Sequence, residues 1–314
     1  MPGRILVTPR SLTAQGLDCV PELGRLRDLG YELVPGPAGQ LPGKEELRTL
    51  ASDVVGWLAG VEKIDADVLA FAPKLRVIAR NGAGTDTIDA AAAKARGVTV
   101  LRAAGANARG VAELALTLIL AALRNVPAGN ATLHNGGWSR IQGKEMSEVR
   151  LGIVGYGAIG RTLAELAGLL GASVTFFDPF ATADPRGAAA QADTLEDLFG
   201  NSDVVSLHAP APADGKPLVT QHLLRLLPQG AVLINTARET LVDTADTLEA
   251  LNTGQLATYA IDAFESEPPV LNDLLRHERT ILTPHIGAYT ASSVTRAVEY
   301  AVENLVGFLQ KDQG

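Results

Sequence analysis

Residues 151–178, LGIVGYGAIGRTLAELAGLLGASVTFFD, decide the fold of this chain. The short apolar run at 151–154 predicts a buried strand, and the apolar residues spaced three and four apart from Ile159 onward predict a helix. A second strand is expected at 173–177, after the helix has ended in glycine. The order strand, turn, helix, strand predicts a parallel α/β unit.

The turn between that strand and helix is a G-x-G-x-x-G, formed by Gly155, Gly157 and Gly160. Such glycines allow a tight turn, a close backbone approach to a pyrophosphate, and close packing of helix on strand. The helix N-terminus presents unpaired N–H groups to the phosphates. Asp178 follows Gly160 by eighteen residues, which suits hydrogen bonds from a ribose 2′-hydroxyl and repulsion of a 2′-phosphate. The stretch therefore predicts a dinucleotide site that prefers NAD to NADP.

Composition excludes several classes of protein. The 314 residues suffice for about two domains, and 46% apolar with 20% charged residues indicates a globular protein with a sizeable core. A formal charge of −8 argues against nucleic acid or an anionic membrane as a main partner. Cys19 is the only cysteine, so we expect neither an intrachain disulfide nor a metal site.

Localisation is predicted from two stretches. The N-terminus MPGRILVTPR lacks the apolar region of a secretory signal. The longest apolar run, residues 114–123, is too short to cross a bilayer. We therefore expect a cytoplasmic protein without membrane contact.

Strands alternate with helices along the whole chain, which predicts parallel sheets covered by helices on both faces. Further strands are expected at 4–8, 31–34, 54–58, 75–79, 98–101, 204–207, 231–235, 258–261 and 280–282. Further helices are expected at 14–29 with an interruption at Pro21, and at 44–51, 65–71, 108–124, 194–199, 221–227, 244–251 and 291–310. The fold class is thus α/β, with two doubly wound, Rossmann-like domains.

The dinucleotide unit lies in the middle of the chain, between two long helices that are suited to cross between domains. We expect residues 104–288 to form the dinucleotide-binding domain, and residues 1–103 with 289–314 to form a substrate-binding domain. This arrangement predicts an active-site cleft between the two domains.

Several loops with reactive side chains follow predicted strands, where parallel sheets bind ligands. The stretch NGAGTD at 81–86 is suited to bind a carboxylate through backbone N–H groups, or is a plain turn before a helix. Arg238 in NTAR is suited to clamp a carboxylate, or is a surface arginine. The stretch DAFESEPP at 262–269 either places acidic side chains at a functional site or is a solvated acidic loop. His285 in TPHIG is either catalytic or structural.

Taken together, GYGAIG with Asp178, NTAR, DAFESEPP and TPHIG resemble, in order and spacing, the D-isomer-specific 2-hydroxyacid dehydrogenases. NGAGTDTID and GVAELALTLILAALRN resemble the substrate loop and interdomain helix of that family, so the resemblance covers nearly the whole chain. It implies an NAD-dependent enzyme that moves a hydride between nicotinamide and C2 of a small 2-hydroxy or 2-oxo acid. A homodimer through the nucleotide domain is expected on the resemblance alone.

The resemblance also implies the roles of individual residues. His285 would be the general acid and base, Glu267 would orient it, and Arg238 would bind the substrate carboxylate and polarise the C2 oxygen. The substrate carboxylate would also be held at Gly82, Ala83 and Gly84. Cofactor contacts are implied for Gly155, Gly157, Ala158, Ile159, Gly160, Asp178, His208, Pro210, Thr236, Ala237, Arg238, Asp262, His285 and Gly287.

Three positions depart from the family pattern. Glu239 follows the catalytic arginine where glycine is usual, Tyr289 replaces a small residue, and Trp57 stands in a stretch where relatives acting on phosphorylated substrates carry arginine. Arg80 and Arg102 are the remaining cations nearby. These features favour a reductase of hydroxypyruvate or glyoxylate over the alternative, a 3-phosphoglycerate dehydrogenase. A further interpretation of the same motifs is an NAD(H)-binding corepressor.

Overall fold

The computed structural model describes residues 3–181, 184, 187–212 and 214–311. The chain divides into two compact units, and each is described by itself. Unit 1 consists of Met1–Asn107 with Ala291–Gly314, and unit 2 consists of Ala108–Thr290. Two stretches far apart in sequence therefore build unit 1, with the dinucleotide stretch lying wholly in unit 2.

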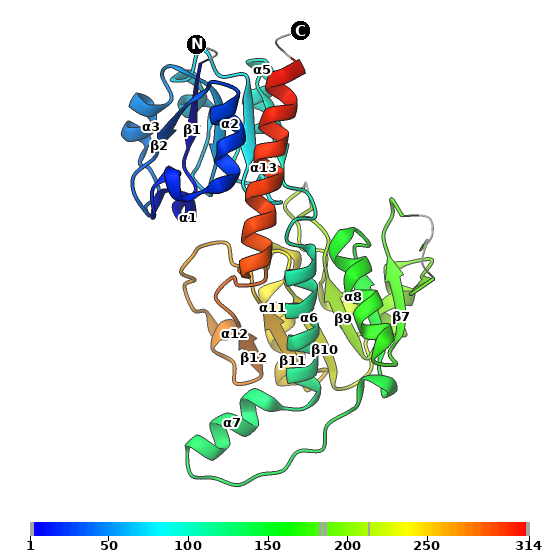
Figure 1. The fold of residues 1–314 in the computed structure, drawn as a ribbon. Coiled ribbons are helices and arrows are strands. Elements are labelled where there is room, and N and C mark those ends of the chain that lie inside the picture. The colour runs from blue at the N-terminus through cyan, green and yellow to red at the C-terminus, as the bar shows by residue number, and fades with distance from the viewer. Residues whose placement is uncertain (1–2, 182–183, 185–186, 213, 312–314) are drawn as a thin grey trace. The chain divides into compact units, whose positions relative to one another are not determined.

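Unit 1 is built on a parallel sheet. Within residues 3–107, five strands lie in the order β2-β1-β3-β4-β5. Their bounds are Arg4–Val7 for β1, Glu32–Pro35 for β2, Val54–Ala59 for β3, Val77–Arg80 for β4 and Thr99–Arg102 for β5. One face packs on α2 (Gly24–Asp28) and the long α13 (Ala291–Lys311), and the other on α3 (Lys44–Leu50), α4 (Ala66–Ala70) and α5 (Ala90–Ala95) (Figure 1).

The helix predicted at 14–29 with a break at Pro21 is divided further than expected. In place of a helix at 14–29, the chain forms α1 (Arg10–Thr13), the 3₁₀ turns η1 (Leu17–Cys19) and η2 (Pro21–Leu23), and then α2. Gly16 has φ +84°, which no helix allows, and Pro21 opens η2 because proline is tolerated only in a first turn.

Unit 2 is a second parallel sheet. Among its described residues, seven strands lie in the order β12-β11-β10-β9-β6-β7-β8. The strands are β6 (Arg150–Val154), β7 (Ser173–Phe177), β8 (Ala190–Gln191), β9 (Val204–Leu207), β10 (Ala231–Asn235), β11 (Leu256–Ile261) and β12 (Thr280–Leu282). The chain reverses its direction of winding between β6 and β9, so a ligand crevice is expected outside the carboxyl ends of these two strands.

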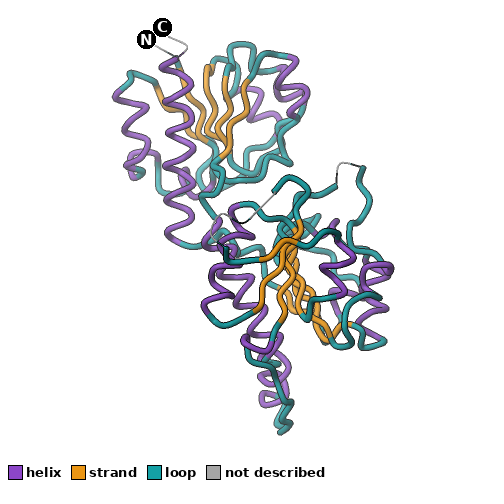
Figure 2. The backbone as a smooth tube through the Cα atoms, turned by 90° about the vertical axis from the view of Figure 1, so that its right-hand side faces the viewer, coloured by secondary structure: helices purple, strands orange, loops and turns teal. Residues whose placement is uncertain are grey.

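Helices cover both faces of this sheet (Figure 2). On one face lie α6 (Ala108–Leu123) and α8 (Ala158–Leu169), and on the other α9 (Leu195–Gly200), α10 (Gln221–Leu224), α11 (Thr244–Asn252) and α12 (Asp273–Arg276). Short 3₁₀ turns, η3 (Met146–Glu148) and η4 (Glu239–Leu241), precede β6 and follow β10. The prediction of two doubly wound parallel-sheet domains is confirmed.

The helix α7 (Val126–His134) is not among the helices that the sequence predicts. Asn125 instead adopts the left-handed conformation at φ +52° and ends α6, and Pro127 then lies in the first turn of α7. None of the nine residues of α7 is buried. Figure 1 shows α7 and the segment after it standing out from the body of unit 2.

The length and apolar content of the described helices bear on whether any of them could cross a membrane. No single one is long and apolar enough to cross a membrane, although α6 and α7, bent by 60°, would pass on length and composition if they were counted as a pair.

Candidate active site

The glycine turn lies at the reversal point of unit 2, between β6 and α8. Gly155 has φ +91°, and a Cβ there would come within 2.7 Å of the backbone of His208 and Ala209. A Cβ on Gly160 would lie 2.3 Å from the carbonyl oxygen of Gly155. A Cβ on Gly157 would meet no other atom within 4 Å. Two glycines are therefore needed for packing, and the third leaves the backbone open to a ligand.

The N-terminus of α8 follows directly, with Ala158 as its first residue and Ile159 half-buried behind it. Asp178, which follows β7, lies beside this turn. Its Oδ2 accepts a hydrogen bond from the N–H of Tyr156 at 2.7 Å, and its Oδ1 accepts one from Phe180 at 2.8 Å. A carboxylate has about four lone-pair sites, so Asp178 keeps acceptor capacity for hydroxyl groups.

His208 follows β9, next to Gly155 in space. Its Nε2 lies 2.9 Å from Oγ of Ser206, and its Nδ1 lies 3.5 Å from Oγ1 of Thr236. Burial lowers the pKa of His208 from 6.5 to about 4, so the ring is neutral at pH 7. Thr236 is buried and Pro210 is exposed. The ends of β6, β9 and β10 thus contribute small, uncharged groups to one edge.

A turn after β10 carries Arg238, and the buried Asn235 shapes it. The Asn235 side chain donates to the carbonyl of Arg238 at 2.8 Å and accepts from the N–H of Ala237 at 3.1 Å. The Arg238 guanidinium donates to the carbonyl of Ala237 at 2.7 Å, and the side chain is half-buried. The sequence predicts no role for Asn235 itself. A polar residue at the end of an otherwise apolar strand was the available signal.

Glu267 and His285 are brought together from loops that follow neighbouring strands, β11 and β12. Oε1 of Glu267 is hydrogen-bonded to Nδ1 of His285. The two side chains are 47% and 46% exposed, so the other ring nitrogen has room to meet a substrate. His285 has φ +52°, a left-handed conformation that is uncommon outside glycine and that the surroundings must enforce.

Asp262 supplies that constraint. The residue is 2% exposed. Its Oδ1 accepts from Oγ1 of Thr283 at 2.6 Å and from the N–H of Ile286 at 2.9 Å, and its Oδ2 accepts from the N–H of Gly287 at 2.9 Å. These bonds lie on both sides of His285 in sequence. The buried carboxylate therefore fixes the loop that presents the histidine.

Unit 1 contains the predicted carboxylate loop. Gly82, Ala83 and Gly84 are half-buried and follow β4 directly. Gly82 has φ +142°, and a Cβ there would lie 3.0 Å from the guanidinium of Arg80. Trp57, in contrast, is fully buried in the core, and its Nε1 donates to Oγ1 of Thr8 at 2.9 Å. Trp57 therefore faces no ligand, and its identity gives no information on substrate charge.

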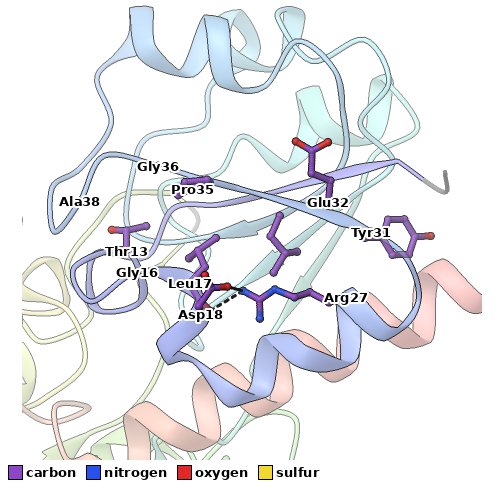
Figure 3. Close-up of a pocket in the computed structure, with 11 residues that line it drawn as sticks. Thr13, Gly16, Leu17, Asp18, Arg27, Tyr31, Glu32, Pro35, Gly36 and Ala38 are labelled. Carbon is purple, nitrogen blue, oxygen red and sulfur yellow. Dashed lines mark hydrogen bonds and ion pairs between the residues drawn. The ribbon is translucent and has the colours of Figure 1, made fainter.

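A hollow of 540 Å³ also lies in unit 1, beside β2 (Figure 3). Arg27 lies in it and pairs with Asp18 at 2.9 Å. None of the residues predicted for the active site lines this hollow. The chemistry described above therefore belongs to the strand ends and not to this hollow.

Comparison with known proteins agrees with this geometry. Residues 116–287 match the family model described as D-isomer specific 2-hydroxyacid dehydrogenase, NAD binding domain. A D-3-phosphoglycerate dehydrogenase of Haemophilus influenzae is 40% identical over 280 residues, which are 86% of this chain and 68% of that protein. A hydroxypyruvate reductase of Thermotoga maritima is 33% identical over 83% of this chain and 87% of its own length.

Solved structures extend the likeness to both units. A glyoxylate reductase from Paecilomyes thermophila superposes with a TM-score of 0.87 at 26% identity, over 99% of this chain and 97% of that one. The chain spans about half the length of several phosphoglycerate dehydrogenases that it matches, for example 45% of that of Mycobacterium tuberculosis (strain ATCC 25618 / H37Rv). The match to the NAD-binding model covers more than half of the sequence. This chain belongs to the family of D-isomer-specific 2-hydroxyacid dehydrogenases.

Proposed function

We propose that this protein is an NAD-dependent dehydrogenase that interconverts a small 2-hydroxy acid and its 2-oxo acid. The observation that carries the proposal is the hydrogen-bonded pair of Glu267 and His285, whose histidine lies on a loop that Asp262 anchors. This pair lies at the carboxyl edge of the sheet that also bears the glycine turn. An acid–base group and a dinucleotide site at one sheet edge suit the removal of a proton and a hydride from one carbon.

His285 is the proposed acid and base. In oxidation, neutral Nε2 accepts the proton of the C2 hydroxyl, and in reduction the imidazolium returns it. Glu267 binds Nδ1, which fixes the ring. Proton transfer by a positioned group of this kind contributes roughly 10²–10⁴-fold to the rate.

Arg238 is the proposed ligand of the substrate carboxylate, and it stabilises negative charge on the C2 oxygen. Gly82, Ala83 and Gly84 would hold the same carboxylate through their N–H groups. A cleft between residues 1–103 with 289–314 and residues 104–288 stays a prediction.

The residues at the glycine turn fit NAD. A crowded Gly155, an open Gly157 and the remaining lone pairs of Asp178 suit a pyrophosphate and a ribose. We propose contacts from Ala158, Ile159, His208, Pro210, Thr236, Ala237 and Gly287 along the same edge. When bound, NAD supplies the hydride acceptor for oxidation and, as NADH, the hydride for reduction.

We propose hydroxypyruvate or glyoxylate as the substrate class. Glu239 adds a negative charge next to Arg238, which disfavours a dianionic substrate. The second candidate is 3-phosphoglycerate dehydrogenase, which the 40% identity to the Haemophilus influenzae protein favours.

The test is oxidation of NADH with a panel of 2-oxo acids. We expect a higher kcat/KM for hydroxypyruvate or glyoxylate than for phosphohydroxypyruvate. A clear preference for the phosphorylated acid would support the second candidate. Absence of turnover with every acid would contradict an enzyme and favour an NAD(H)-binding corepressor.

We further propose a cytoplasmic homodimer that assembles through α7 and the segment after it, residues 135–145. Apolar side chains of α7 and of residues 135–145 are strongly exposed: Trp138 is 81% exposed, Ile141 60%, Leu133 58% and Val126 56%. Light scattering on the purified protein should give twice the chain mass, and Trp138→Ser should lower it. A monomeric wild type would refute the dimer.

A further inference from the structure

Glu239, where the family usually has glycine, makes a specific contact. The residue opens η4 directly after Arg238, and its side chain is half-buried. Its Oε2 accepts a hydrogen bond from the backbone N–H of Glu265 at 2.8 Å. The contact joins the turn after β10 to the loop after β11, two strands that lie side by side in the sheet.

The loop on the other side of this contact is the acid loop, residues 262–267, which ends in the proposed partner of His285. At its start, the N–H of Asp262 is bonded to the carbonyl of Asn235 at 3.1 Å. Residues 265–267 are exposed, so packing does little to hold them. Glu265 lies only two residues before Glu267. Fixing the backbone at Glu265 therefore restricts where the Glu267 carboxylate reaches.

We propose that Glu239 is a positioning residue, which latches the acid loop so that Glu267 stays on Nδ1 of His285. The inference rests on the proposed function and names a residue that the family pattern does not supply. Glu239 acts through the backbone of Glu265. It is not a catalytic residue, because its proposed effect on the reaction passes through Glu265 and Glu267.

The charges around the acid loop matter to the test. They are Arg238 and Glu239 from the turn after β10, Asp262, Glu265 and Glu267 from the loop itself, and His285 after β12. Removal of any negative charge here changes the electrostatic field at His285 by itself, whether or not the latch is lost. A variant that removes the charge of Glu239 but keeps its acceptor oxygen must therefore accompany a variant that removes both.

The experiment compares Glu239→Ala, Glu239→Gln and the control Glu265→Ala in the full-length protein. Glu239→Gln keeps a carbonyl oxygen for the N–H of Glu265, and Glu265→Ala removes a nearby carboxylate but keeps that N–H. Two readouts are taken: hydrogen–deuterium exchange of the segment 263–267, and the pH–rate profile for reduction of hydroxypyruvate or glyoxylate by NADH. Glu267→Gln gives the largest shift in that profile and serves as its reference.

In Glu239→Ala we expect exchange of the segment to quicken and kcat to fall, each by about tenfold, the equivalent of one hydrogen bond. The high-pH limb of the rate should move to lower pH, part of the way to its position in Glu267→Gln. Glu239→Gln and Glu265→Ala should stay near wild type in exchange, and each should move this limb less than Glu239→Ala does, because each removes a charge but keeps the partner that the latch needs. The proposed latch is refuted if the exchange rate of residues 263–267, or the high-pH limb of the pH–rate profile, is the same in Glu239→Ala as in wild type. It is also refuted if Glu239→Gln behaves like Glu239→Ala. A wild type without turnover would instead refute the proposed function, while exchange would still test the contact.

Discussion

Among the described residues, each unit buries one carboxylate near the carboxyl ends of its strands, and the two are bonded very differently. Glu62, after β3 in unit 1, is 3% exposed, and Asp262, after β11 in unit 2, is 2% exposed. Oε1 of Glu62 accepts from the N–H of Gly60 at 3.0 Å and from the hydroxyl of Thr8, which lie at the ends of β3 and β1. Its Oε2 has no partner among the described residues. Asp262 has both oxygens engaged by the loop after β12.

A buried carboxylate is therefore no sign of function in itself. Burial of a charge is costly, and hydrogen bonds compensate it. What distinguishes the two residues is where the bonds lead. Glu62 ties together the ends of two core strands, whereas Asp262 holds a strained loop that presents His285. We infer that the first carboxylate is structural and the second serves the reaction.

The largest expected effect is that of His285→Gln. If the Asp262 loop exists to present this histidine, kcat for reduction should fall on the order of 10²-fold or more, because the proton donor is lost. NADH affinity, measured by isothermal titration, should be largely kept. A near-normal rate would contradict a role in the reaction both for His285 and for the loop that Asp262 holds.

Asp262→Asn should lower the rate less than His285→Gln does, and it should act through the same loop. Asparagine cannot accept from both Thr283 and Gly287 in the present geometry, since one of its two atoms is a donor. A hydrogen bond to a charged group contributes about 1.5–3 kcal/mol, so we expect kcat/KM to fall roughly 10- to 10²-fold. Steady-state kinetics with NADH checks it. An unchanged kcat/KM would place Asp262 in the same class as Glu62.

A third carboxylate, Asp178, is half-buried, and backbone N–H groups bond both of its oxygens. Asp178 differs from Glu62 and Asp262 because it is predicted to contact a ligand directly. Asp178→Ser should weaken NADH use and relax discrimination against NADPH by about fivefold, one charge–phosphate repulsion being worth about 1 kcal/mol in water. Kinetics with both cofactors tests this prediction. A wild type that prefers NADPH would refute it.

The positions of most strands and the glycine turn were predictable from sequence, because both depend on local patterns. The meeting of Glu267 and His285 was also accessible, since neighbouring parallel strands end at one edge. The orientation of Trp57 was not, because β3 is buried on nearly every residue and shows no alternation of polar and apolar positions. The latch of Glu239 on Glu265 and the three bonds of Asp262 depend on side-chain geometry between distant segments, which spacing does not encode.

His208 gives unit 2 a dependence on pH that the buried carboxylates do not explain. Its pKa is lowered by burial from 6.5 to about 4, so between these values the unfolded chain binds more protons than the folded one. The contribution of His208 to the free energy of unfolding is therefore largest above pH 6.5 and declines as the pH falls toward 4. The decline is on the order of 1–2 kcal/mol after allowance for the partial exposure of the His208 side chain. Urea titrations of wild type and His208→Gln at pH 4.5 and 7.5 measure this. An equal decline in both proteins would assign the acid sensitivity to other groups.

The smallest effect should come from Glu62→Gln, the partner experiment to Asp262→Asn. Glutamine keeps a carbonyl oxygen for Gly60 and Thr8 and removes a buried charge that lacks a full set of donors. The lost bond to a charged acceptor and the relieved desolvation oppose each other, so the free energy of unfolding should change by less than about 1 kcal/mol. kcat/KM should stay within about twofold of wild type. Thermal unfolding and NADH kinetics measure the two quantities on one preparation. A tenfold loss of kcat/KM without loss of stability would show that Glu62 also serves the reaction, and the contrast between the two carboxylates would fail.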